Sequence, residues 1–135
     1  VVMLHMGDEY APLPNEFQEE TATAALDAGA DLVLGGHPHV VEPFAGPIWY
    51  SHGNFLHGQW EEPTKIGGIG EFTFTKRGDE VSFAGARFMP TYTVGPPISY
   101  DHRVIPLVEA ADYVDVEAWM ADLRERLNVE VVDYL

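Results

Sequence analysis

Two stretches decide the fold of this chain: Val1-Val2-Met3-Leu4-His5-Met6-Gly7 and Asp31-Leu32-Val33-Leu34-Gly35-Gly36-His37-Pro38-His39. In each, a short apolar run rich in β-branched residues gives way abruptly to glycine and histidine. Such runs are typical of parallel strands that are buried on both faces. In open α/β sheets, ligands bind outside the carboxyl ends of the strands. The two stretches therefore predict histidines at the rim of a sheet, where a ligand would bind.

A helix is predicted between these strands. Asn15 is a suitable N-cap, and Gln18 three residues later completes a capping-box pattern. The helix is expected to run to about Ala28, with Gly29 at its C-terminal cap. Its buried side is expected to comprise Phe17, Ala24, Ala25 and Ala28.

Strand, helix and strand within ~35 residues form a βαβ unit, whose two strands are expected to be parallel and adjacent. This topology predicts that His5 lies beside His37.

The rest of the chain is expected to be more strongly antiparallel. A short strand is predicted at 48–51, and a hairpin is predicted from strands at 71–75 and 81–88. The proline-rich residues 90–106 are expected to be extended over the surface of the domain. A last helix is predicted from the N-cap Asp115 to Leu127, ended by Asn128, with three residues facing the core: Trp119, Leu123 and Leu127.

Composition bounds the class of protein. The chain has 135 residues, 46% of them hydrophobic, so residues 1–135 are expected to form a single globular domain or a fragment of one. A fragment is favoured because the chain opens inside a predicted strand without an initiator methionine. It carries 22 Asp and Glu against 7 Lys and Arg, a net charge of −15, with no basic patch to hold nucleic acid or anionic lipid. It has no cysteine, which excludes disulfides and thiolate chemistry.

Metal ligation is the interpretation we favour for the histidine pair. His37 and His39 are one residue apart around a proline, and two glycines before them let the backbone turn sharply. Two imidazoles packed together need a cation or a carboxylate between them. His5 joins them through the βαβ geometry, although a single buried histidine is more often structural. Asp8 and Glu9 are candidates to accept hydrogen bonds from the ligating imidazoles, or else solvent-facing acids of a loop.

The stretch Ser51-His52-Gly53-Asn54 is less specific. Adjacent residues seldom form a catalytic triad, because triads assemble from separate loops. Asn54 is interpreted as a hydrogen-bonding or turn residue. His52 and His57 lie either near the metal or at the surface, and the surface is expected for His57.

Three motifs carry a family resemblance: His5-Met6-Gly7-Asp8-Glu9-Tyr10, the run from Gly29 to His39, and Tyr50-Ser51-His52-Gly53-Asn54-Phe55. In order and spacing they resemble successive motifs of the CapA family of bacterial and archaeal capsule-synthesis (poly-γ-glutamate biosynthesis, PgsA-like) proteins. The resemblance covers residues 1 to about 110, the later part of the family's domain. It implies an α/β fold, the later part of a calcineurin-like metallophosphoesterase sandwich with a βαβ unit, an antiparallel β region and a C-terminal helix.

The resemblance also implies a site. His5 matches an isolated metal-ligand histidine, and His37 and His39 match a G-H-x-H pair that supplies one histidine to each metal of a two-metal centre of Mn, Zn or Fe. Glu9 and Asn54 match polar positions near the cleft and are the candidate catalytic residues. Two such cations ~3.5–4 Å apart clamp a phosphoryl group and activate a water.

The chain departs from the family pattern in three respects. Met6 replaces the usual aromatic residue, and His52 replaces the usual apolar residue. The N-terminal aspartate, asparagine and histidine motifs, which supply the bridging carboxylate and the remaining ligands, are absent from this chain. The two-metal site is therefore expected to be completed by residues outside it.

Two functions follow from the resemblance. One is a divalent-metal-dependent, phosphoesterase-like hydrolase acting on a phosphorylated or polyanionic substrate in capsule metabolism. The other is a non-catalytic scaffold or binding component of a polyglutamate synthesis and export complex. The missing N-terminal part of the domain, a second copy or another subunit is expected to cover the open strand edge. For the full-length protein, the resemblance implies a membrane-associated or extracytoplasmic location.

Overall fold

The structure is a computed structural model that describes residues 1–95 and 101–135. Its helices and strands follow in this order: β1 (Val2–His5), α1 (Glu16–Asp27), β2 (Val33–Gly36), β3 (Phe44–Ala45), β4 (Ile48–Trp49), α2 (Glu62–Lys65), β5 (Ile66–Arg77), β6 (Glu80–Val94), β7 (Arg103–Pro106), the 3-10 helix η1 (Leu107–Glu109), α3 (Val116–Arg126) and β8 (Glu130–Val131). The expected α/β class is confirmed.

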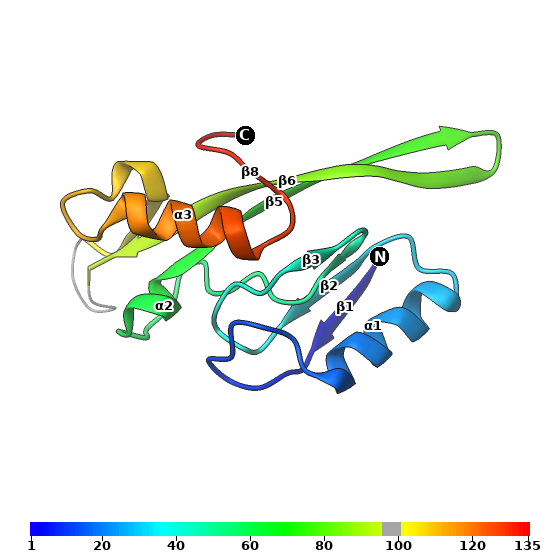
Figure 1. The fold of residues 1–135 in the computed structure, drawn as a ribbon, viewed down its shortest axis with the longest axis horizontal. Coiled ribbons are helices and arrows are strands. Elements are labelled where there is room, and N and C mark those ends of the chain that lie inside the picture. The colour runs from blue at the N-terminus through cyan, green and yellow to red at the C-terminus, as the bar shows by residue number, and fades with distance from the viewer. Residues whose placement is uncertain (96–100) are drawn as a thin grey trace.

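The first sheet contains the predicted βαβ unit. Its strand order is β1-β2-β4-β3, with β1, β2 and β4 parallel and β3 antiparallel to β4. Helix α1 runs along one side of this sheet (Figure 1). The register pairs His5 with Gly36, so β1 and β2 end at the same level. The predicted strand at 48–51 is shorter, at Ile48–Trp49.

Helix α1 has the predicted cap but not the predicted buried side. The Asn15 side chain accepts from the Gln18 backbone N–H at 3.0 Å, and the Gln18 side chain accepts from the Asn15 N–H at 3.0 Å. Phe17 is 63% exposed, whereas Gln18 and Ala22 are buried. The prediction was wrong because it followed apolarity, while a buried hydrogen-bond partner selects the polar Gln18 for the interior.

Strand β1 is not covered on both faces as predicted. Met3 is 75% exposed, because among the described residues β1 pairs only with β2 and forms an edge of its sheet. Val2 and Leu4 point toward α1 and are half-buried there.

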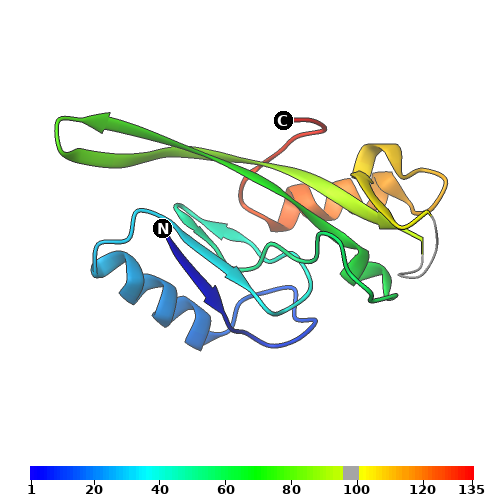
Figure 2. The same ribbon diagram turned by 180° about the vertical axis from the view of Figure 1, so that it is seen from behind.

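The second sheet is built on a long hairpin of β5 and β6, which extends well past the rest of the molecule (Figure 2). The hairpin is longer than predicted, since β5 begins at Ile66 rather than at residue 71. Two glycines near the start of β5 are needed for close packing: a Cβ on Gly67 would strike the backbone of Asn54, and one on Gly68 would strike the Phe88 ring.

The strand β6 continues to Val94 and pairs with β7, so much of the proline-rich 90–106 segment belongs to the sheet rather than wrapping the domain. Residues 96–100 of that segment lie outside the described residues.

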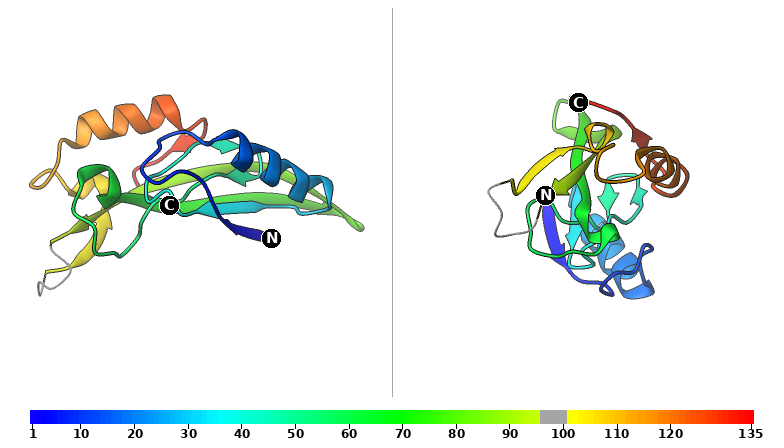
Figure 3. Two further views of the ribbon diagram at one scale, coloured as in Figure 1. Left: turned by 90° about the horizontal axis from the view of Figure 1, so that it is seen from below. Right: turned by 90° about the vertical axis from the view of Figure 1, so that its left-hand side faces the viewer.

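Two apolar cores hold the layers together. One lies between α1 and the first sheet, around Ala22, Val33 and Ile48. The larger joins the two sheets and α3, and includes Trp49, Phe88 and Leu123. Helix α3 has the predicted Asp115 cap, and α1 and α3 lie apart from each other, each against its own sheet (Figure 3). None of the helices in the described ranges has the length and apolarity that a membrane span requires.

Candidate metal centre

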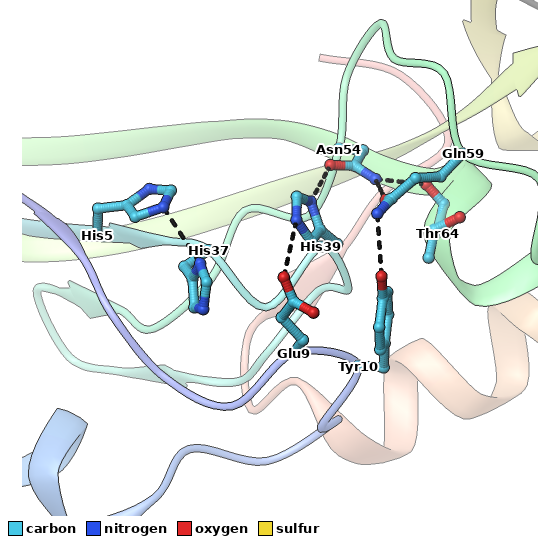
Figure 4. Close-up of polar contacts among 8 residues, drawn as sticks. All are labelled: His5, Glu9, Tyr10, His37, His39, Asn54, Gln59 and Thr64. Carbon is cyan, nitrogen blue, oxygen red and sulfur yellow. Dashed lines mark hydrogen bonds and ion pairs between the residues drawn. The ribbon is translucent and has the colours of Figure 1, made fainter.

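The ends of β1 and β2 bring His5 and His37 into contact. The Nε2 atom of His5 lies 3.1 Å from Nδ1 of His37, and the ring centroids are 4.8 Å apart (Figure 4). The predicted adjacency of these two histidines is confirmed. It follows directly from the parallel register, in which His5 is level with the residue before His37.

His39 joins this pair through an unusual backbone. His37 has a φ of 109° and His39 a φ of 63°, conformations that non-glycine residues seldom adopt. Such backbone strain tends to cluster at functional sites, where the surrounding structure imposes it. The ring centroids of His37 and His39 lie 6.1 Å apart, so the three imidazoles form a row along the sheet edge (Figure 4).

Asn54 fixes the tautomer of His39. The Asn54 amide nitrogen donates to the carbonyl of Thr64 at 3.1 Å and to Gln59 at 2.8 Å, which leaves its oxygen facing His39 Nδ1 at 3.0 Å. Nδ1 of His39 must therefore carry the hydrogen. In the neutral ring, Nε2 then presents a lone pair. A metal-ligating histidine has the same arrangement, with its second nitrogen donating to a neighbouring acceptor.

A carboxylate faces that lone pair. Glu9 Oε1 lies 3.9 Å from His39 Nε2, and both side chains are partly exposed. A neutral imidazole nitrogen and a carboxylate are both acceptors, so a cation between them would satisfy both. Asp8, the other candidate, instead accepts from the Asn15 side chain at 3.0 Å.

Three further residues of this network were missed by the sequence analysis: Tyr10, Gln59 and Thr64. The Tyr10 ring stacks against His39 with centroids 6.1 Å apart, and its hydroxyl accepts from Gln59 at 3.2 Å. The only sequence signal was the presence of Tyr10 in the motif that begins at His5. Gln59 and Thr64 reach the site through tertiary contacts with Asn54, which no local pattern encodes.

The two other nearby histidines differ in position. The His52 ring is exposed and packs over Gly36, with Nδ1 donating to the carbonyl of Gly53 at 2.7 Å. His57 is not at the surface as predicted but half-buried, because its Nδ1 accepts the Gln59 backbone N–H within a tight turn. Burial lowers the pKa of His57, and the nearby His102 and His39 act in the same direction.

The three histidines and Glu9 fit one part of a metal site better than they fit a complete site. In residues 1–95 and 101–135, no group of three or more histidine and acidic side chains is placed to hold a metal ion by itself. The donors that are present, however, include one imidazole, that of His39, whose Nε2 lone pair faces the Glu9 carboxylate, and this donor pair suits Zn, Mn or Fe.

An α/β sheet with histidines at the ends of parallel strands agrees with the metallophosphoesterase-like fold of one capsule-synthesis family. Residues 1–59 match the model of that family, the bacterial capsule synthesis protein PGA_cap. The match confirms the family resemblance, although it ends well before residue 110.

Two curated relatives agree. The chain is 40% identical over 82 residues to the PGA biosynthesis protein CapA of Bacillus subtilis (strain 168), covering 58% of this chain and 22% of the relative. It is 39% identical over 85 residues to the capsule biosynthesis protein CapA of Bacillus anthracis, covering 60% of this chain and 21% of the relative. The chain thus spans about a fifth of the length of these relatives. No solved structure matches it significantly.

A buried carboxylate supports the loop that carries Glu9. Glu42 is fully buried; its Oε2 accepts from the Gln18 side chain at 2.7 Å, and its Oε1 has no partner among the described residues. Through Gln18 and Asn15 it is linked to Asp8. Burial raises the pKa of Glu42 to about 7, against the opposing effect of the Gln18 hydrogen bond. A charged residue inside the apolar run 40–44 was the sequence signal for it.

The raised pKa of Glu42 predicts a loss of stability as the pH rises. Between the ordinary value of 4.5 and about 7, the folded state keeps a proton that the unfolded state has lost, so the free energy of unfolding falls across this range. Glu42→Gln should remove this decline and be more stable than the wild type by about 3 kcal/mol near pH 8, but not near pH 5. Urea unfolding of both proteins across this range measures the difference. Parallel pH profiles would contradict the assignment.

Proposed function

We propose that this chain is the histidine-bearing part of a CapA-type capsule (poly-γ-glutamate) biosynthesis protein, in which His5, His37 and His39 bind divalent metal ions. The observation that carries the metal proposal is the Asn54–His39 hydrogen bond, which leaves the His39 Nε2 lone pair beside Glu9. The names of the two CapA relatives support the role in capsule biosynthesis. Residues outside this chain would complete a two-metal site of Mn, Zn or Fe.

The proposed chemistry is hydrolysis of a phosphorylated or polyanionic substrate. Bound cations would supply charge neutralisation and an activated water. In this chain, Asn54 acts as a positioning residue that orients His39. Glu9 is the group placed to contact a cation or its water, since its carboxylate faces His39 Nε2.

A non-catalytic binding role is the second candidate. It is favoured by the His5–His37 contact, because these two ring nitrogens satisfy each other at 3.1 Å without a cation. In that case the histidines would stabilise a scaffold in a polyglutamate synthesis and export complex. The metal-binding experiment below distinguishes the two roles, because only the first requires the histidines to bind cations.

We also propose that another strand covers the free edge of β1. Among the described residues this edge is unpaired and Met3 is 75% exposed, which favours strand addition. The strand would come from the remainder of the parent protein or from a second copy. Sedimentation velocity of residues 1–135 should therefore show self-association, and the full-length protein should show less of it. A stable, cooperatively unfolding monomer of residues 1–135 would contradict this.

Metal binding predicts a rise in melting temperature of the full-length protein with Mn²⁺ or Zn²⁺. A ligand that binds only the folded state adds about 2.7 kcal/mol at about 100 times its Kd. His37→Ala and His39→Ala should each remove most of this metal-induced shift, and His5→Ala a good part of it.

The control for this experiment is His57→Ala, because His57 lies outside the row of three imidazoles. Its baseline stability can fall, since it is half-buried, but the difference with and without metal should persist. If the His37 and His39 variants kept the wild-type shift, the metal site would be wrong and these histidines structural.

The role of Asn54 predicts a contrast between two substitutions. Asn54→Leu removes the acceptor of His39 Nδ1 and should weaken metal affinity about 10–100-fold. Asn54→Asp keeps an acceptor for His39 Nδ1 but loses the hydrogens donated to Thr64 and Gln59, so it should lose less affinity than Asn54→Leu. Calorimetric titration of Mn²⁺ into the full-length variants measures both. Equal affinity in the Leu variant and the wild type would refute the role of Asn54 in positioning His39.

A further inference from the structure

Two clefts flank Tyr10 next to the row of histidines. One, of about 210 Å³, lies between the Tyr10 loop and α3 and is walled by apolar residues such as Val40, Pro63 and Ile66. The other, of about 200 Å³, lies on the Trp60 side of Tyr10. Tyr10 belongs to both, and its ring stacks on His39 (Figure 4).

Aromatic side chains are the main feature of these clefts. Trp60 is 57% exposed and Tyr10 is 53% exposed, and Tyr10 is held in place by its stacking on His39 and its bond to Gln59. Trp119 of α3, half-buried, adds a third ring in the larger cleft. Aromatic rings with polar edges suit ligands that present both an apolar face and hydroxyl groups.

The charge of the clefts does not suit an anion. The smaller cleft contains one carboxylate, Glu61, and no Lys or Arg. In the larger cleft the charges form an ion pair, with Arg126 bound to Asp122 at 2.9 Å. The nearby Lys65 is paired with Glu62 at 3.8 Å. On a chain of net charge −15, a polyanion would therefore be repelled here unless bound cations intervened.

We infer that the clefts beside Tyr10 bind an uncharged sugar and thereby select the organic part of the substrate. This inference rests on the proposed function, because the phosphorylated end of the substrate would lie at the metal ions and its sugar would extend past His39 onto Tyr10 and Trp60. The substrate class is then a phosphorylated saccharide, rather than a polyanionic chain held directly by the protein.

The test is a fluorescence titration of the full-length protein with chitotriose, a neutral oligosaccharide, and with poly-γ-glutamate, both in EDTA. Trp60 and Trp119 report on the clefts, while Trp49 is buried in the core. Chitotriose should give a saturable change with a Kd below about 10 mM, whereas poly-γ-glutamate should give none. Trp60→Ala should weaken chitotriose binding at least about tenfold.

Tyr134→Ala is the matched control, since Tyr134 is a similarly exposed aromatic residue that bonds Glu109 away from the clefts. It should leave the titration unchanged. Two results would overturn the inference: no saturable response to chitotriose, or Trp60-dependent binding of poly-γ-glutamate in EDTA. Trp60→Ala should not alter the metal-induced thermal shift. In the wild-type protein, a metal-induced shift without saccharide binding would refute only the sugar site, and saccharide binding without a metal-induced shift would refute only the metal site.

Discussion

The parallel pairing of β1 with β2 is the constraint on which the rest of the structure depends. Its register sets His5 level with Gly36, so that the next residue, His37, meets the His5 ring at the end of the strands. A side chain at position 36 would displace the His52 ring, because its Cβ would lie 3.1 Å from His52 Nε2. Slipping the register by one residue would turn His5 to the opposite face of the sheet and disperse the histidine row.

Helix α1 is held against the first sheet by polar contacts as well as by its apolar core. Gln18 closes the capping box with Asn15 and also reaches Glu42, so one buried side chain ties the helix start to the segment after β2. A fully buried carboxyl group with only one partner costs stability whenever it is ionised. The fold tolerates that cost at a position which braces the loop between His5 and α1, and this loop carries Glu9 and Tyr10.

Much of this arrangement could be predicted from the sequence because the relevant signals are local. The capping box at Asn15, the Asp115 cap and the adjacency of His5 and His37 each follow from residues close in sequence or from one βαβ rule. The failures are tertiary. Phe17 is exposed because Gln18 has a distant partner, β5 begins at Ile66 because its glycines pack against Asn54, and His57 is half-buried by a turn that closes on Gln59.

Asn54 connects the two sheets to the site. A bridge between Gly53 and Gly67 and the Asn54 bond to Thr64 attach the start of β5 to the loop that orients His39. The Gln59–Tyr10 bond extends the same network to the aromatic clefts. His39 therefore lies where the ends of β1 and β2, the second sheet and the clefts meet. A change in any of these three parts would shift the position of its imidazole. A cation bound at His39 Nε2 would in turn be held by a ring whose orientation is fixed from both sheets.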